Sequence, residues 1–350
     1  MSYGLNIKLA RESRGLTQKE LAKLVGITQV SLSRMEKSDA VIALPIIEKI
    51  GKTLNYPISF FDKIFDDREI QSSLFYRKRA TMKVHDLNII NRRIQIINKV
   101  IDTLLDAVEI PEFSIPAIEC TDEYQADEIA YRLKKYLKFP SSPILNIVNT
   151  IEKCGVIVCF LNTGNSGDKF DGLTTFTTKG YPIIYLNDNM PNDRKRFNLI
   201  HELGHLTMHM RSENLKKSEE EKEEEANLFA AEFLLPRATC ITDLSNMRLR
   251  DLPELKSKWM VSKAFLIHRA KELCCISENT SKYYYITLGR NGEKKQESGY
   301  VPIDRPTILN KMIGLHLNSL AYSMDEMSDM LGLCKDEILE LYGTKMTLSI

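Results

Sequence analysis

The fold is decided by the stretch Arg196-Phe197-Asn198-Leu199-Ile200-His201-Glu202-Leu203-Gly204-His205. Its apolar residues recur at helical spacing, and on a helix two histidines four positions apart lie one turn apart on the same face. Neutral imidazole nitrogens are typical ligands of Zn²⁺. The stretch therefore predicts a helix that presents His201 and His205 to a single metal ion.

A catalytic zinc site holds three protein ligands, so a third donor must come from another segment. His209 continues the four-residue series, but it lies roughly 12 Å of helical rise from the first histidine and cannot join both at one ion. The next acidic segment, residues 223–227, comes just before a buried apolar stripe. There Glu223 can coordinate the ion while Asn227 orients the ligands, with Glu224 and Glu225 as competing candidates.

Glu202 points about 100° around the helix from His201, which keeps it out of the ligand set. From that position its carboxylate can act as a general base toward water and then pass the proton to a leaving amine. A zinc ion lowers the pKa of a bound water toward about 7 and polarises a carbonyl. We therefore expect a peptide hydrolase in which Glu202 is the catalytic residue.

The first sixty residues predict a compact helical bundle, because apolar positions recur at helical spacing between short polar turns. Thr17 and Glu20 form a capping signal before a helix over residues 18–24, and Gly26 ends that helix. Thr28 can then cap a third helix. Helix, tight turn and helix predict a helix-turn-helix bundle of the five-helix type.

In such motifs the second helix lies in the major groove of DNA. Gln29 can pair bidentately with adenine and Val30 can contact a thymine methyl, whereas Gln18 is expected at a phosphate. The alternative is a bundle that serves dimerisation or protein interaction, because the net charge of the chain is only +1. The DNA-contacting residues expected within residues 17–37 are Gln18, Thr28, Gln29, Val30, Ser33 and Arg34.

We expect a multidomain, mainly α chain with four parts. These are a helix-turn-helix domain over 1–67, a helical linker over 68–139, an α+β metallopeptidase domain over 140–240 and a mostly helical region over 241–350. Strands are predicted over 156–161, 173–177 and 183–186, and residues 282–288 followed by Asn291-Gly292 predict a hairpin. The basic residues near the start of the linker are interpreted as a solvated helix face, with contacts to phosphates as the alternative: Arg77, Lys78, Arg79 and Lys83.

With the residues that follow it, the metal-binding stretch resembles the ImmA/IrrE family of metallopeptidases over roughly residues 140–240. The second part of the resemblance is Glu223 to Asn227 and Phe229-Ala230-Ala231-Glu232-Phe233-Leu234-Leu235-Pro236. The resemblance implies a zincin-like domain with one Zn²⁺ on His201, His205 and Glu223, and with Glu202 catalytic. Other divalent ions such as Mn²⁺ are expected to substitute in vitro. The resemblance also implies cleavage of a repressor or antitoxin-like protein in stress, phage or mobile-element circuits.

The segments Leu16 to Ala22 and Val25 to Glu36 resemble the XRE family of phage-repressor-like helix-turn-helix domains. This resemblance covers nearly all of residues 5–61 and implies operator DNA as a partner, together with a homodimer as a second expectation. The alternative function is a transcriptional regulator or antitoxin whose peptidase-like domain senses a metal or a partner without cleaving it. A third hypothesis makes residues 241–350 a surface that recruits the substrate.

The strand predicted over 183–186 is hypothesised to offer an edge to which a substrate peptide adds as an extra strand. The alternative is a core strand with Tyr185 packed inside the domain.

Composition agrees with a folded cytoplasmic protein that has no membrane partner. The chain of 350 residues is 43% hydrophobic and 27% charged, which is ordinary for folded soluble proteins. It has no apolar run of about 18 residues and no secretory signal at its amino end. Its seven cysteines include no CxxC pair, which argues against a disulfide framework or a cysteine zinc ribbon.

Overall fold

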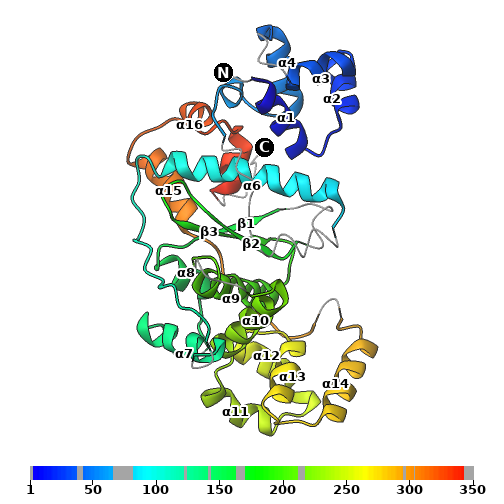
Figure 1. The fold of residues 1–350 in the computed structure, drawn as a ribbon, viewed down its shortest axis with the longest axis vertical. Helices are drawn as coiled ribbons and strands as arrows, with labels where there is room; N and C mark the ends of the chain where they lie inside the picture. The colour runs from blue at the N-terminus through cyan, green and yellow to red at the C-terminus, as the bar shows by residue number, and fades with distance from the viewer. Residues whose placement is uncertain are drawn as a thin grey trace, which may run out of the picture.

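The structure, a computed structural model, describes residues 3–37, 42–65, 82–121, 124–140, 143–162, 170–211, 217–294, 297–302 and 304–342. Figure 1 shows the amino-terminal helices at one end of the molecule, a small sheet in the middle and a group of helices at the other end. The domain boundary expected at residue 67 lies outside the described residues, as do Arg77, Lys78 and Arg79.

The amino-terminal bundle has its helices where the capping signals predict them. α1 spans Tyr3–Ser13, α2 Gln18–Val25, α3 Gln29–Lys37 and α4 Leu44–Leu54, and the short 3₁₀ helix η1 spans Ile58–Phe60. The Thr17 hydroxyl accepts from the Glu20 N–H at 3.2 Å, and the Glu20 carboxylate accepts from the Thr17 N–H at 2.8 Å. Gly26 ends α2 at φ 74°, a left-handed conformation that glycine adopts at little cost. The helix-turn-helix bundle is therefore confirmed.

Three strands form the central sheet in the order β1-β3-β2, and each lies where the sequence predicts a strand. β1 spans Ile157–Leu161, β2 Gly172–Phe176 and β3 Pro182–Asn187. β3 runs parallel to β1 and antiparallel to β2. The sheet gives the middle of the chain its α+β character.

The predicted peptide-binding edge over residues 183–186 is wrong, because β3 is the central strand and pairs on both sides. The alternative is correct: Tyr185 is fully buried, and its hydroxyl donates to the Asn98 Oδ1 at 2.7 Å. A continuous apolar run such as that of β3 is typical of a strand covered on both faces, which is the physical sign of a central position. The sheet's edges are β1 and β2.

Helices cover both faces of the sheet. α6 (Val84–Leu104) crosses one face, where its Asn98 meets Tyr185 and its Asp102 accepts from the Thr178 N–H at 2.9 Å. α8 (Ile147–Glu152) and α9 (Asn192–Met208) lie against the other face. α10 (Glu219–Leu234) packs on α9 from the side away from the sheet, and α7 (Ala126–Tyr136) packs on α10 (Figure 1).

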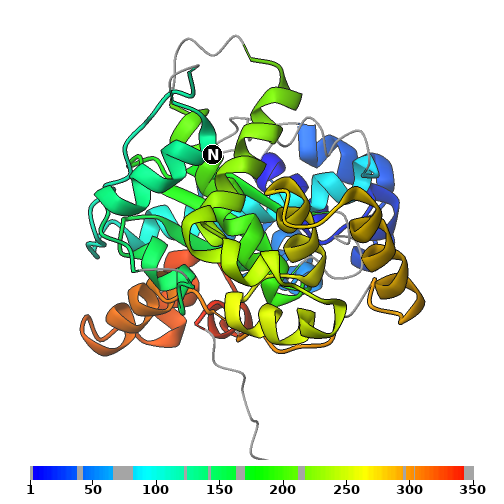
Figure 2. The ribbon, with the colours of Figure 1, turned by 90° about the horizontal axis from the view of Figure 1, so that it is seen from below.

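Four α-helices and a 3₁₀ turn follow α10 and form the far end of the molecule, which faces the viewer in Figure 2. They are α11 (Arg237–Ser245), η3 (Leu249–Asp251), α12 (Leu252–Trp259), α13 (Lys263–Glu272) and α14 (Glu278–Arg290). Ion pairs tie this group back to the preceding helices: Arg269 of α13 pairs with Glu232 of α10, and Lys256 of α12 with Asp193 of α9.

The predicted hairpin over residues 282–292 is wrong, because α14 occupies most of this segment. The Ser277 hydroxyl caps the helix by accepting from the Thr280 N–H at 3.1 Å. Ser281, Tyr284 and Leu288 are buried at helical spacing, so packing overrides the strand propensity of the local tyrosine and isoleucine residues. Asn291-Gly292 forms the turn at the helix end, with Gly292 at φ 77°.

The last described helices return to the amino-terminal side of the molecule. α15 (Ile308–Asn318) packs on β1 and α6, and α16 (Met324–Leu331) packs on α6 and η1. α17 (Lys335–Leu341) follows, and its Glu337 pairs with Arg14 at 2.6 Å. These contacts give α16 and α17 a packing role. Within the described part of the chain, no helix is both long and apolar enough to cross a membrane.

Two hydrophobic cores meet at the sheet. One joins the amino-terminal bundle, α6, one face of the sheet and α15 to α17. The other joins α7 to α14 with the opposite face. Residues beyond 240 are thus divided between the two cores, with α11 to α14 in one and α15 to α17 in the other.

Candidate functional site

α9 presents His201 and His205 toward α10. Two buried ion pairs hold the start of the helix: Lys256 Nζ lies 2.5 Å from Asp193 Oδ2, and Arg196 pairs with Asp304. The two histidine rings are buried, and their Nε2 atoms lie 3.1 Å apart. The sequence expectation that these histidines share one face of a helix agrees with this geometry.

α10 brings the carboxylate of Glu223 to the same point. Its Oε1 lies 3.5 Å from His205 Nε2, and its Oε2 lies 3.7 Å from His201 Nε2. Gly204 allows the two helices to approach this closely, because a Cβ there would lie 3.1 Å from the ring of Phe229 and 3.4 Å from Ala226 Cα. A side chain at position 204 would require the Phe229 ring or α10 to shift by a few tenths of an ångström.

The three side chains fit a single zinc ion. Their donor atoms all lie within 4.8 Å of one another. In a tetrahedral zinc site with bonds of 2.0–2.1 Å, neighbouring donors lie about 3.3 Å apart, and the Nε2–Nε2 and Nε2–carboxylate distances of 3.1, 3.5 and 3.7 Å bracket that value. Two imidazoles and one carboxylate are also the donor set of a known class of catalytic zinc sites.

The outer nitrogen of each of these histidines meets a further side chain. His201 Nδ1 lies 3.0 Å from Asn227 Oδ1, the residue expected to orient the ligands. His205 Nδ1 lies 2.9 Å from His209 Nδ1, and His209 Nε2 lies 2.9 Å from Glu225 Oε2. Glu225 also pairs with Lys217. His209 is therefore behind His205 and not at the candidate metal position.

Of the two competing acids, neither lies in the candidate ligand group. Glu225 is committed to His209 and Lys217, and Glu224 is exposed. Burial raises the pKa of Glu225, but hydrogen bonds from Lys217 and His209 outweigh it and lower the pKa below its ordinary value. Burial lowers the pKa of His209, against the opposing effect of Glu225.

Glu202 lies on the side of α9 that faces β2. It is 1% exposed, and its Oε2 accepts a hydrogen bond of 2.8 Å from the hydroxyl of Thr174. Glu202 thus contacts the edge strand β2, while the neighbouring His201 faces Glu223 of α10. A carboxylate held in this way next to a metal-binding face suits the general-base role expected of it.

In the amino-terminal bundle, α3 packs against α1 and α2 through Leu32, while most of the expected DNA-contacting residues face outward. Val30 is 61% exposed. Thr28, Gln29 and Arg34 are also exposed, and Ser33 is half-buried. This is the surface that a groove-binding helix requires.

Gln18 has a structural partner as well. Its Nε2 donates to Glu36 Oε2 at 2.8 Å, and Glu36 in turn binds Arg11, whose Nε lies 2.6 Å from Glu36 Oε1. This buried ion pair connects α1 to α3. Gln18 is half-buried beside it, so its contact with a phosphate stays a prediction.

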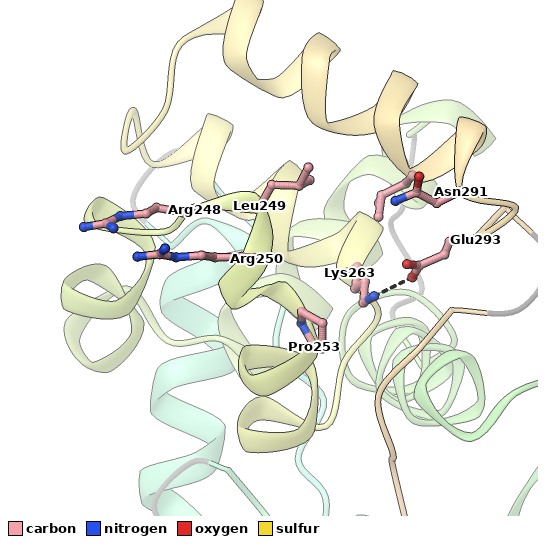
Figure 3. Close-up of a pocket in the computed structure, with 8 residues that line it drawn as sticks. Arg248, Leu249, Arg250, Pro253, Lys263, Asn291 and Glu293 are labelled. Carbon is pink, nitrogen blue, oxygen red and sulfur yellow. Dashed lines mark hydrogen bonds and ion pairs between the residues drawn. The ribbon is translucent and has the colours of Figure 1, made fainter.

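A hollow of about 510 Å³ lies among η3, α12, α13 and α14, apart from the candidate metal centre. Figure 3 shows Arg248 and Arg250 extending side by side away from Lys263, which points toward Glu293. Lys263 pairs with Glu293 and donates to the Ser298 hydroxyl at 2.5 Å. The buried cation of this hollow thus has its partners within the chain.

Family models match the two regions of the chain that contain these residues. Residues 151–271 match the family model described as IrrE N-terminal-like domain, and residues 7–61 match the model described as Helix-turn-helix. The chain joins a helix-turn-helix domain to an IrrE-like domain. The match to the IrrE-like domain includes the whole of α9 and α10, and continues through α11 and α12 into α13.

A curated relative gives a more limited likeness. Over 92 residues the chain is 32% identical to the antitoxin PezA of Streptococcus pneumoniae. The alignment covers 25% of this chain and 57% of the antitoxin, so the chain spans little more than half the length of that relative. What PezA does is therefore no direct guide to the IrrE-like domain.

Three residues near the candidate metal centre of the IrrE-like domain carry contacts that the sequence does not foretell: Thr174, His209 and Glu225. His209 had a signal, since it repeats the four-residue spacing of His201 and His205, and it lies at the C-terminal end of α9. Thr174 had none, because its contact depends on how β2 lies across α9.

Proposed function

We propose that this chain is a zinc-dependent endopeptidase whose action is linked to DNA through its helix-turn-helix domain. The observation that supports this best is that the donor atoms of His201, His205 and Glu223 lie together. Glu202 is buried on α9, the helix that carries the two histidines. The match of this region to an IrrE-like peptidase family supports the same reading.

In this proposal His201, His205 and Glu223 hold the ion, and Glu202 moves the proton. Bound zinc supplies acidification of a water and polarisation of a peptide carbonyl. Glu202 takes a proton from water, and Thr174 fixes the orientation of the carboxylate through its hydrogen bond. The protonated Glu202 then delivers that proton to the nitrogen of the leaving amine. Asn227 holds the ring of His201 in place.

The substrate is proposed to bind as an added strand along β2. This strand lies at the edge of the sheet, and its Thr174 contacts Glu202, so a peptide paired to β2 would run past the catalytic carboxylate. Main-chain hydrogen bonds would give such a peptide its affinity. An extended, locally unfolded segment of a protein is therefore the substrate form that suits the site.

We propose a DNA-binding repressor or an antitoxin-like protein as the target, in a stress, phage or mobile-element circuit. The helix-turn-helix domain supports an operator as a second partner, in the cytoplasm where such DNA is found. Domains of this kind commonly bind two half-sites as dimers, so a homodimer on the operator is part of the proposal.

The decisive experiment compares zinc-loaded wild type with Glu202→Gln on repressor and antitoxin-like proteins encoded beside this chain. Wild type should cut one of them at a defined peptide bond, identified by mass spectrometry. Glu202→Gln should cut about 10²–10⁴-fold more slowly, because an amide cannot accept the proton. It should keep its zinc, since Glu202 is not among the ligands. Cutting by the variant at the wild-type rate would refute the assignment of Glu202.

The likeness to an antitoxin supports a second candidate function, that of a transcriptional regulator. In this alternative proposal the IrrE-like domain senses zinc or a partner and cleaves nothing. The discriminating measurement is operator affinity with and without zinc, at several salt concentrations. A zinc-dependent affinity combined with intact candidate targets would favour this regulator. Zinc-independent affinity combined with cleavage favours the peptidase.

A further inference from the structure

His205 is anchored from behind by a chain of polar contacts that no ligand role explains. Its Nδ1 lies 2.9 Å from His209 Nδ1, and His209 Nε2 lies 2.9 Å from Glu225 Oε2. Only 2% of the His209 side chain is exposed, so its ring is held inside the protein. We propose that His209 and Glu225 are positioning residues that fix His205 as the Nδ1–H tautomer, with the Nε2 lone pair turned to the metal position.

The donor and acceptor in each of these hydrogen bonds follow from where the protons can lie. The Glu225 carboxylate can only accept, so His209 must donate from Nε2. A neutral His209 then has a lone pair at Nδ1, which can only accept from His205. His205 must therefore carry its proton on Nδ1, and its Nε2 is left with the lone pair that faces His201 and Glu223. If His209 Nδ1 instead donated to His205 Nδ1, the proton of His205 would be on Nε2 and would block coordination of a metal there.

Lys217 holds Glu225, the last residue in this series of contacts. It pairs with Glu225, and its Nζ also donates to the backbone carbonyl of Cys120 at 3.0 Å. An ammonium group beside Glu225 favours the charged carboxylate, which is the form that must accept from His209. This series of polar contacts thus connects the segment before α7 to α10, and α10 to the end of α9.

The two histidines of the candidate site are therefore held differently. His201 Nδ1 meets the side-chain amide of Asn227, which lies at the exposed margin of α10. His205 depends on a buried imidazole backed by an ion pair. Partners of this type commonly contribute 10- to 100-fold to metal affinity. The inference rests on the proposed zinc site, but the tautomer can be measured without metal or substrate.

The first test is the protonation pattern of the metal-free full-length chain at neutral pH. Long-range ¹H–¹⁵N correlation spectra distinguish the two tautomers of each imidazole, and the six histidines can be assigned by single substitutions. We expect the proton of His205 on Nδ1 and that of His209 on Nε2. In Glu225→Gln this preference should weaken for both rings, whereas Glu224→Gln should leave it unchanged. A proton on Nε2 of His205 in the wild type would overturn the proposal.

The second test is zinc affinity, measured by competition with a chromophoric chelator. His209→Phe keeps a ring but removes the acceptor, and Glu225→Gln removes the carboxylate, so both should bind zinc about 10- to 100-fold more weakly. Glu224→Gln is the matched control and should bind like the wild type. Wild-type affinity in both His209→Phe and Glu225→Gln would overturn the proposal and leave the proposed peptidase standing. A wild type that binds no zinc would refute the peptidase, while the tautomer spectra would still decide the role of His209 and Glu225.

Discussion

Thr174 makes a single hydrogen bond that bears directly on the proposed chemistry. Its hydroxyl donates to Glu202 Oε2 at 2.8 Å inside the protein. Hydrogen bonds to charged groups contribute about 1.5–3 kcal/mol. We therefore expect Thr174→Val to lower the rate of peptide cleavage roughly 10- to 100-fold. Zinc affinity should not change, because the hydrogen bond of Thr174 goes to Glu202, which is not among the proposed ligands.

Thr175→Val is the matched control for that measurement. Thr175 is the next residue on β2, and its hydroxyl faces the other side of the sheet, 3.4 Å from Asn98 Oδ1. Its substitution should leave the cleavage rate within about twofold of the wild type, since that contact is long and remote from Glu202. Equal losses in the two variants would mean that Thr174 acts through the stability of β2 and not through Glu202.

At this scale the sequence predicts what lies on one helix and misses what depends on two elements. His201, Glu202 and His205 follow from spacing along α9 alone. Glu223 required a second helix, so the sequence left Glu224 and Glu225 open as alternatives. The contact between Thr174 and Glu202 joins residues 28 positions apart, and no periodicity carries that information.

At the scale of elements, a partly buried lysine joins α7 to α10, and its positive charge lowers the stability of the folded protein. Lys134 Nζ donates to the Phe233 carbonyl at 3.0 Å and lies 5.1 Å above the Phe233 ring. Burial lowers the pKa of Lys134 from 10.5 to about 8, with Glu232 opposing the change. Between these two values the unfolded chain binds more protons than the folded one, so this lysine makes the free energy of unfolding rise with pH.

We expect the wild type to gain about 2 kcal/mol of unfolding free energy relative to Lys134→Met between pH 7.5 and pH 10. The comparison with the variant removes the contribution of every other titrating group. Urea titrations at the two pH values, followed by circular dichroism, provide the measurement. A difference between the two proteins that is the same at both pH values would show that Lys134 keeps an ordinary pKa in the folded state.

Elements were predictable where local chemistry determines them. The Thr17 and Glu20 capping box, the left-handed Gly26 and the three strands all lie where their local signals indicate. The two errors arose where partners decide the outcome. β3 is central because strands pair on both of its sides, and α14 is a helix because Tyr284 and Leu288 pack on the second core.

At the scale of the whole molecule, the two cores share the strands of one sheet. Ile183 and Tyr185 of β3 belong to the core of the amino-terminal bundle, while Ile184 and Leu186 belong to the core of α9 and α10. Neighbouring residues of a strand point to opposite faces of the sheet. Unfolding of the sheet would therefore disrupt both cores. We therefore expect the stabilities of the two cores to be coupled through the shared sheet.

Ile313 tests whether the two cores unfold as one. It is fully buried in α15, within the core that includes the amino-terminal bundle, and replacing it with alanine should cost about 3 kcal/mol of unfolding free energy. Leu315 lies on the same helix and is 43% exposed, so Leu315→Ala should change that energy by less than about 0.5 kcal/mol.

The readout uses the one tryptophan of the chain, Trp259, which is buried in the other core. Because the strands belong to both cores, we expect Ile313→Ala to shift the urea transition seen by Trp259 fluorescence as much as the transition seen by circular dichroism. A shift in circular dichroism with an unchanged fluorescence transition would mean that the two cores unfold separately. In that case the sheet would not couple the two cores, and the proposed link between DNA binding and peptide cleavage would need a partner molecule to make it.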